Sequence, residues 1–165
     1  ILFLGRLHKD KGLDLLIRAF KMIEDRDWVL IIAGPDEHGY RQRYKNVKNI
    51  IFTGLVDGNI KASLYEISDV FILPSYGEGF SISLLEAMSY KKPLIISKFC
   101  YFSDIEKHNA GLVIELNEHE IMQSLHKILD DNNLKNEMRN NSFQLVKKKY
   151  DNKFIFKRMT KLYSR

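Results

Sequence analysis

Short runs of consecutive apolar residues alternate along this chain with segments whose apolar residues recur at helical spacing. Apolar residues at consecutive positions, as in Ile1-Leu2-Phe3-Leu4, are typical of strands covered on both faces. Leu13, Leu16 and Phe20 instead share one stripe of a helix. Strand, helix and strand in succession form parallel β-α-β units. The sequence therefore predicts the α/β class, with an open, twisted parallel sheet and helices on both of its faces.

Six runs are predicted as strands, and helical patterns separate most of them. The predicted strands are residues 1–4, 28–33, 49–52, 70–73, 93–97 and 112–114. The predicted helices between them are residues 12–23, 40–44, 60–67 and 81–89. Beyond residue 117 the pattern is helical only, over residues 118–129, 134–150 and 152–163. Ligands of such sheets bind at the carboxyl ends of the strands, so the turns after the strands are the places to search for a site.

Length and composition indicate one ordinary globular domain. The 165 residues suffice for one full core and are few for two. The 45% hydrophobic and 28% charged content are typical of a soluble protein, and no apolar run approaches the length of about 20 residues that a membrane helix needs. The lone Cys100 excludes an internal disulfide, which suits a reducing, cytoplasmic compartment. Because Ile1 already belongs to an apolar run, we expect the chain to be a fragment of a longer protein.

The net charge of +5 is concentrated late in the chain. The late cations are Lys147, Lys148, Lys149, Lys153, Lys157, Arg158, Lys161 and Arg165. The plain interpretation is a solvated helical face. The alternative is attraction to anionic lipid headgroups, which would bring the protein to the inner face of a membrane. A nucleic-acid partner is disfavoured because no binding motif accompanies the charge.

Two glutamates, Glu78 and Glu86, make the stretch after the fourth predicted strand the most informative one for function. Glu78 lies in a Gly-Glu-Gly turn, and Glu86 lies among leucine, alanine and methionine on a predicted helix. A carboxylate in apolar surroundings needs a partner. A helix that begins near Ser81 directs its free N–H groups and its positive end toward the turn, which suits an anion such as a phosphate. Glu86 then lies about one turn deeper, within reach of hydroxyl groups attached to that phosphate.

The loop after the first predicted strand, Gly5 to Gly12, combines two glycines with cations. Arg6 offers a fork of donors and Lys11 a point charge, and both suit a diphosphate. A solvated turn before a helix is the alternative, and the residues of the loop leave both interpretations open. The loop is neither a dinucleotide fingerprint nor a P-loop, because G-x-G-x-x-G and G-x-x-x-x-G-K-[ST] are both absent from the chain.

Other chemistries have little support in the sequence. The five histidines show no metal-ligand spacing, so we expect no metal site. Ser75, Ser81 and Ser83 lack the G-x-S-x-G elbow of serine hydrolases. Cys100 follows lysine and phenylalanine and precedes tyrosine, and such a cysteine is more typical of a small buried hydrophobe than of a nucleophile.

Taken together, the turn motifs resemble a known enzyme family. In chain order they are Gly5-Arg6-Leu7, Lys11-Gly12, Ala33-Gly34, Phe52-Thr53-Gly54, Leu73-Pro74-Ser75, Glu78-Gly79-Phe80 and Leu84-Leu85-Glu86-Ala87-Met88. They resemble the C-terminal half of the family 4 retaining glycosyltransferases over essentially the whole chain, and the E-x7-E element is the specific one. The resemblance implies a GT-B architecture, in which two Rossmann-like domains face a cleft. Residues 1–165 would be the nucleotide-sugar-binding half, without the N-terminal half that shapes the acceptor site.

The resemblance also implies a role for each matched position. Arg6 and Lys11 would neutralise the donor diphosphate, with Lys61 a weaker candidate for the same region. Glu86 would accept hydrogen bonds from the ribose, and Glu78 would be the catalytic residue beside the transferred sugar. Backbone groups would complete the site: Val56 at the base, and Gly79, Phe80, Ser81 and Ile82 at the sugar and phosphate. The nucleotide-sugar would be the donor substrate, and neither a metal nor a further cofactor would be required.

Two departures from the family pattern bear on the donor. Ser81 stands where glycine is common, and residues 97–104 lack a glycine pair that many members carry after the fifth strand. The implied function is retaining transfer of a hexose from a UDP-, GDP- or ADP-sugar to an acceptor in cell-envelope or capsule polysaccharide synthesis, and the fragment alone would be inactive. A nucleotide-sugar epimerase of the same architecture and a non-catalytic nucleotide-binding module are the alternatives.

Overall fold

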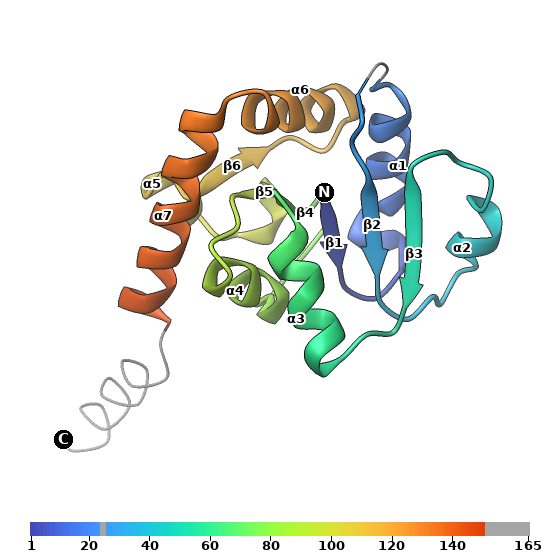
Figure 1. The fold of residues 1–165 in the computed structure, drawn as a ribbon, viewed down its shortest axis with the longest axis horizontal. Coiled ribbons are helices and arrows are strands. Elements are labelled where there is room, and N and C mark those ends of the chain that lie inside the picture. Colours follow the sequence, from blue (N-terminus) through green and yellow to red (C-terminus); the bar gives the residue numbers. More distant parts are fainter. Residues whose placement is uncertain (24–25, 151–165) are drawn as a thin grey trace.

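The core of the molecule is a parallel sheet of six strands (Figure 1). A computed structural model describes residues 1–23 and 26–150. The strands are β1 (Leu2–Leu4), β2 (Leu30–Ala33), β3 (Ile50–Gly54), β4 (Phe71–Leu73), β5 (Leu94–Ser97) and β6 (Gly111–Ile114), in the order β3-β2-β1-β4-β5-β6. This is the Rossmann order. The predicted class, the parallel sheet and all six predicted strands are confirmed, with ends that differ by one or two residues.

Seven helices and two short 3-10 turns accompany the strands of the described part. They are η1 (Lys9–Lys11), α1 (Leu13–Lys21), α2 (Tyr40–Arg43), α3 (Gly58–Ile67), α4 (Ile82–Ser89), η2 (Lys98–Cys100), α5 (Asp104–Lys107), α6 (Glu118–Leu129) and α7 (Asn132–Lys149). The predicted start of α7 at residue 134 is two residues late, because Asp131 caps the helix by accepting from the amides of Asn133 and Leu134. The sequence did not predict α5, η1 or η2, although it did predict the equally short α2 at residues 40–44. The predicted helix at 152–163 lies outside the described residues.

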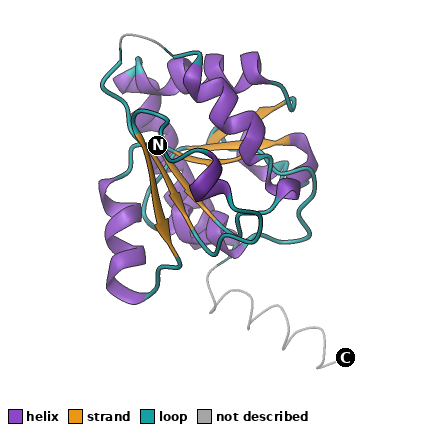
Figure 2. Cartoon of the chain, turned by 90° about the vertical axis from the view of Figure 1, so that its right-hand side faces the viewer, coloured by secondary structure: helices purple, strands orange, loops and turns teal. Residues whose placement is uncertain are grey.

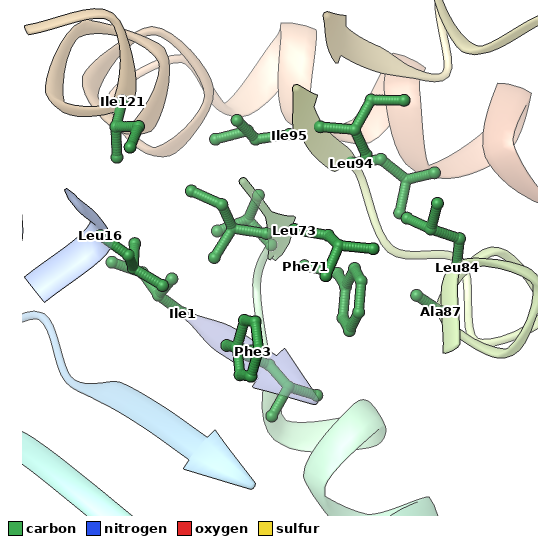
Figure 3. Close-up of a cluster of buried hydrophobic side chains, with 14 of the residues drawn as sticks. Ile1, Phe3, Leu16, Phe71, Leu73, Leu84, Ala87, Leu94, Ile95 and Ile121 are labelled. Atoms are coloured by element: carbon green, nitrogen blue, oxygen red, sulfur yellow. The ribbon is translucent and has the colours of Figure 1, made fainter. Parts of the chain in front are cut away.

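Helices cover both faces of the sheet (Figure 2). The consecutive residues Phe71, Ile72 and Leu73 of β4 are all buried, and successive side chains of a strand point to opposite faces. Figure 3 shows the side chains of β4 between Leu16 of α1 on one side and Leu84 of α4 on the other. Helix α6 contacts α1, α4 packs on β4 and β5, and α7 contacts both α6 and α4. The apolar runs of the sequence are therefore strands in a two-sided core.

The loops after β1 and β4 pack tightly against each other at the carboxyl edge of the sheet. Gly12 ends η1 with φ +69°, and a Cβ atom there would lie 1.9 Å from the carbonyl oxygen of Pro74. Only glycine accepts both this conformation and this approach. The first strand pairs with β2 on one side and with β4 on the other, so the order of the strands reverses here. A Rossmann-like sheet binds its ligands at this point.

Candidate functional site

Backbone hydrogen bonds join the loop after β1 to the loop after β4. The carbonyl oxygen of Asp10 accepts from the amide of Tyr76 at 2.7 Å and from the hydroxyl of Ser75 at 2.9 Å. Ser75 is fully buried, and its hydroxyl oxygen also lies 3.1 Å from the carbonyl oxygen of Gly77. These bonds hold the Gly-Glu-Gly turn beside η1, the short turn that carries Lys11. The two loops that the sequence marked as candidate ligand loops therefore form one structure.

Lys11 and Glu78 meet where these two loops join. The Nζ atom of Lys11 lies 2.5 Å from Oε1 of Glu78, and only 18% and 11% of the two side chains are exposed. The backbone amide of Glu78 donates to the carbonyl of Phe99 at 3.2 Å, so η2 helps to fix the backbone position of this glutamate. The candidate phosphate ligand and the candidate catalytic residue thus form a largely buried ion pair at the switch point of the sheet.

Glu86, the second glutamate of the motif, is held at both of its carboxylate oxygens. Lys61 Nζ lies 2.6 Å from Oε1, and the hydroxyl of Tyr65 donates to Oε2 at 3.0 Å. Lys61 and Tyr65 are four positions apart on α3, so one face of that helix makes both contacts. The expectation that this carboxylate needs a partner is confirmed. Sequence reasoning missed Tyr65, although its spacing from Lys61 was a usable signal.

Arg6 pairs with a glutamate outside the motif, whereas Lys11 and Lys61 pair with Glu78 and Glu86. Its guanidinium pairs at 3.2 Å with Glu37 from the loop after β2, and 61% of the Arg6 side chain is exposed. An exposed ion pair of this kind contributes roughly 0–1 kcal/mol, so an anion can compete with Glu37 for the guanidinium. The assignment of Arg6 to a diphosphate stays a prediction.

Helix α4 begins at Ile82, shortly after the Gly-Glu-Gly turn, and the free amides of its first turn point toward its N-terminal end. Ser81, the residue before the helix, has extended dihedral angles and makes no side-chain bond to the amides of the first turn. Its hydroxyl lies 3.0 Å from that of Ser83. A Cβ atom built on Gly77 or Gly79 would meet no described atom within 4 Å. Packing within the described residues therefore does not require glycine in this turn, and the space beside its backbone suits a ligand.

The remaining predicted contacts lie at the same edge of the sheet. Phe80 and Ile82, on either side of Ser81 at the start of α4, are exposed at 63% and 68%. Val56 follows β3 and is partly buried against the core, next to Leu55, which is 78% exposed. The assignment of Val56 to a base, and of the backbone of residues 79–82 to sugar and phosphate, stays a prediction.

The protonation states of Tyr65 and Cys100 limit the chemistry that these side chains can perform. Burial and the nearby Glu86 carboxylate raise the pKa of Tyr65, so its hydroxyl keeps its proton and donates at neutral pH. Burial also raises the pKa of the Cys100 thiol, which agrees with a packing role rather than a nucleophilic one.

Within residues 1–23 and 26–150, no three His, Cys, Asp or Glu side chains are grouped to hold a metal ion. Every helix in the same ranges is too short or too polar to cross a bilayer.

Comparison with known proteins places these features in a family. The model of the family "Glycosyl transferases group 1" matches residues 1–145. An uncharacterized glycosyltransferase of Methanocaldococcus jannaschii is 33% identical over 99% of this chain and 44% of its own length. The capsular polysaccharide biosynthesis glycosyltransferase CapM of Staphylococcus aureus is 24% identical over 98% of this chain and 45% of its own length. The chain thus spans about half the length of the curated relatives that it matches.

A solved structure supports the fold. The structure of Anabaena HepE in complex with UDP-glucose has a TM-score of 0.85 to this chain at 19% identity, and the match covers 99% of this chain and 48% of HepE. The prediction of a Rossmann-like, GT-B type domain is therefore confirmed. The family match also favours the transferase over the epimerase alternative. This chain belongs to the glycosyl transferases group 1 family.

Proposed function

We propose that this chain is the C-terminal, nucleotide-sugar-binding domain of a retaining glycosyltransferase that adds a hexose in cell-envelope or capsule polysaccharide synthesis. The observation that carries the proposal is the pairing of both motif glutamates with lysines: Lys11–Glu78 at the switch point of the sheet and Lys61–Glu86 between α3 and α4. Family membership and the similarity to CapM, a capsular polysaccharide enzyme by its name, support the reaction class and its setting.

The two lysines suit a leaving nucleoside diphosphate. An ammonium group has three donors, so each lysine can keep its glutamate and still bind a phosphate oxygen. The diphosphate gains negative charge as the glycosidic bond breaks, and fixed cations and amide dipoles are strongest against charge that develops in the transition state. In this proposal Lys11, Lys61 and Arg6 supply the cations, and the amides at the start of α4 supply the dipoles. Donor binding then needs no divalent metal.

The two glutamates take different parts of the donor. Glu86 accepts hydrogen bonds from the ribose, because 29% of its side chain remains exposed and its orientation is set by two contacts. Glu78 lies in the Gly-Glu-Gly turn, nearer the carboxyl end of β4, and acts at the transferred sugar. The backbone of residues 79–82 lines sugar and phosphate, and the backbone of Val56 meets the base.

The proposal also covers the identity of the donor and a second domain that would face this site. The donor is a UDP-, GDP- or ADP-hexose, in keeping with the UDP-glucose in complex with HepE. The cavities of about 370 and 950 Å³ beside β6 and beside Trp28 have no site residue in their walls, so neither of them is the proposed donor site. A facing N-terminal domain would close the edge and carry the acceptor site, so the chain by itself would bind donor without transferring it. The protein would act in the cytoplasm, with contact to the inner face of the membrane as an open alternative.

Isothermal titration calorimetry of the 165-residue chain with UDP, GDP and ADP, each in the presence of a chelator, tests this function. We expect one of the three nucleotides to bind and the free nucleoside to bind far more weakly, because the cations act on the diphosphate. Absence of binding by all three nucleotides would overturn the proposed donor site.

A further inference from the structure

Tyr65 is a buried side chain that the proposed function leaves without a role. Its relative exposure is 0%, and its ring stacks on Tyr90 with centroids 5.2 Å apart and an interplanar angle of 12°. The ring of Phe71 lies at 6.0 Å on the strand β4. The aromatic ring is therefore fixed by packing on its sides, and the direction of the hydroxyl group is fixed with it.

The hydroxyl of Tyr65 is directed at the motif rather than at solvent. It donates to Oε2 of Glu86 at 3.0 Å and lies 3.2 Å from the carbonyl oxygen of Ser83 in the first turn of α4. The hydroxyl is therefore within hydrogen-bond distance of both the second glutamate and the first turn of α4. Lys61 occupies the other oxygen of Glu86, Oε1, at 2.6 Å.

These contacts decide how Glu86 can receive a ligand. An ionised carboxylate accepts at about four lone-pair positions on its two oxygens. Lys61 and Tyr65 use one position on each oxygen, which stops rotation of the carboxylate and leaves the remaining positions in one orientation. A ribose presents two adjacent hydroxyl groups, and two hydroxyls gain from an acceptor whose two oxygens are held in place.

We infer that Tyr65 is a positioning residue for ribose recognition, which acts by holding Oε2 of Glu86 against the first turn of α4. This inference rests on the proposed function, in which Glu86 accepts hydrogen bonds from the ribose of the donor. The competing explanation is that the hydroxyl only stabilises the packing of α3 on α4. The two explanations differ in whether Tyr65 affects the discrimination between a ribonucleotide and its deoxy analogue.

The test is calorimetry of the 165-residue chain with the preferred nucleoside diphosphate and with its 2′-deoxy and 3′-deoxy analogues. The variant Tyr65→Phe keeps the buried ring and removes only the hydroxyl. We expect the preference of the variant for the ribonucleotide over the deoxy analogues to fall about tenfold, the factor that one hydrogen bond to a charged group can supply. Binding of inorganic pyrophosphate, which has no ribose, should stay within about twofold of wild type.

Tyr44→Phe is the matched control, because its hydroxyl also donates to a carboxylate, Oδ1 of Asp14 at 2.7 Å, on α1 rather than in the motif. It should keep the ribose preference of wild type. A double-mutant cycle separates positioning from general stability: Tyr65→Phe should have no further effect on ribose preference when Glu86→Gln is already present.

Three outcomes are distinguishable. A lowered ribose preference with intact pyrophosphate binding supports the inference. An unchanged preference in Tyr65→Phe, or an equal loss for ribonucleotide, deoxy analogues and pyrophosphate, overturns it and leaves the donor site standing. Failure of the wild-type chain to bind any of the nucleotides would instead overturn the proposed function on which the inference rests.

Discussion

Lys11 and Glu78 are 67 positions apart in the sequence, and their side chains form an ion pair with Nζ and Oε1 2.5 Å apart. The pair closes the junction between the loops after β1 and β4, and the similar pair of Lys61 and Glu86 lies on the neighbouring helices α3 and α4. Each motif glutamate therefore neutralises a cation that the proposal assigns to the diphosphate. A bound diphosphate must share these lysines with the glutamates, and this sharing shapes the expectations for the site.

Removal of a phosphate cation should weaken the nucleoside diphosphate far more than the nucleoside. Lys11→Ala should cost about 1.5–3 kcal/mol of diphosphate affinity, the range for hydrogen bonds to charged groups, and Arg6→Ala should lose less because its guanidinium is exposed. Calorimetry with both ligands measures the two losses. Lys45 is an exposed lysine after α2, and the control variant Lys45→Ala should change the affinity for neither ligand. Equal losses for nucleoside and diphosphate would remove Lys11 from the phosphate role.

The close approach of Gly12 to Pro74 should make Gly12 one of the least replaceable residues of the site. Gly12→Ala would place a Cβ atom 1.9 Å from the Pro74 carbonyl oxygen, in addition to the strain of a left-handed φ. Gly39→Ala is matched in conformation, with φ +68°, but its Cβ atom would meet nothing within 4 Å. We expect Gly39→Ala to lower the free energy of unfolding by roughly 1–2 kcal/mol and Gly12→Ala by at least about 1–3 kcal/mol more. Urea unfolding of both variants measures the difference, and equal losses would refute the close packing of the two loops.

Asp104 should contribute stability that acid removes. A hydrogen bond from Lys149 is the main cause that holds the pKa of Asp104 below its ordinary value of 3.8, and Tyr150 adds to it. The folded state thus binds this proton less tightly than the unfolded chain does. The contribution is present above pH 3.8 and is lost as the pH falls through the lower folded value. Urea unfolding should therefore show a difference between wild type and Asp104→Asn that shrinks as the pH is lowered through this range, and a difference constant with pH would contradict the assignment.

Sequence reasoning predicted the sheet and the motif glutamates, but not the side chains that pair with those glutamates. The strands were predictable because both of their faces are buried, so their apolar residues are consecutive, as in Phe71 to Leu73. Glu78 and Glu86 were recognisable because carboxylates near apolar segments need partners. The identity of those partners depends on tertiary structure: Lys11 meets Glu78 only because Gly12 lets two loops touch, and Tyr65 meets Glu86 only because α3 packs beside α4.

Three of the four shortest helical elements of the described part were not predicted. Helix α5 has four residues and η2 has three, and neither contains one full repeat of an amphipathic pattern. The equally short α2 was predicted because Tyr40 and Tyr44 recur at helical spacing. Yet η2 matters for the site, since the carbonyl of Phe99 accepts from the amide of Glu78. Residues 97–104, which include η2, are also those that lack the glycine pair of the family pattern. This departure therefore lies in the segment whose backbone contacts Glu78, the candidate catalytic residue.

In the proposed site the two motif glutamates serve different parts of the donor. The most direct test is the affinity of the Glu78→Gln and Glu86→Gln variants for the bare nucleoside diphosphate. Glu86→Gln should weaken binding, because it removes the charged acceptor for the ribose. Glu78→Gln should leave binding unchanged or tighter, because it releases Lys11 for the phosphate, while it lowers turnover in the full-length enzyme that we propose. The opposite pattern, with bare-nucleotide binding abolished by Glu78→Gln and unaffected by Glu86→Gln, would contradict the account.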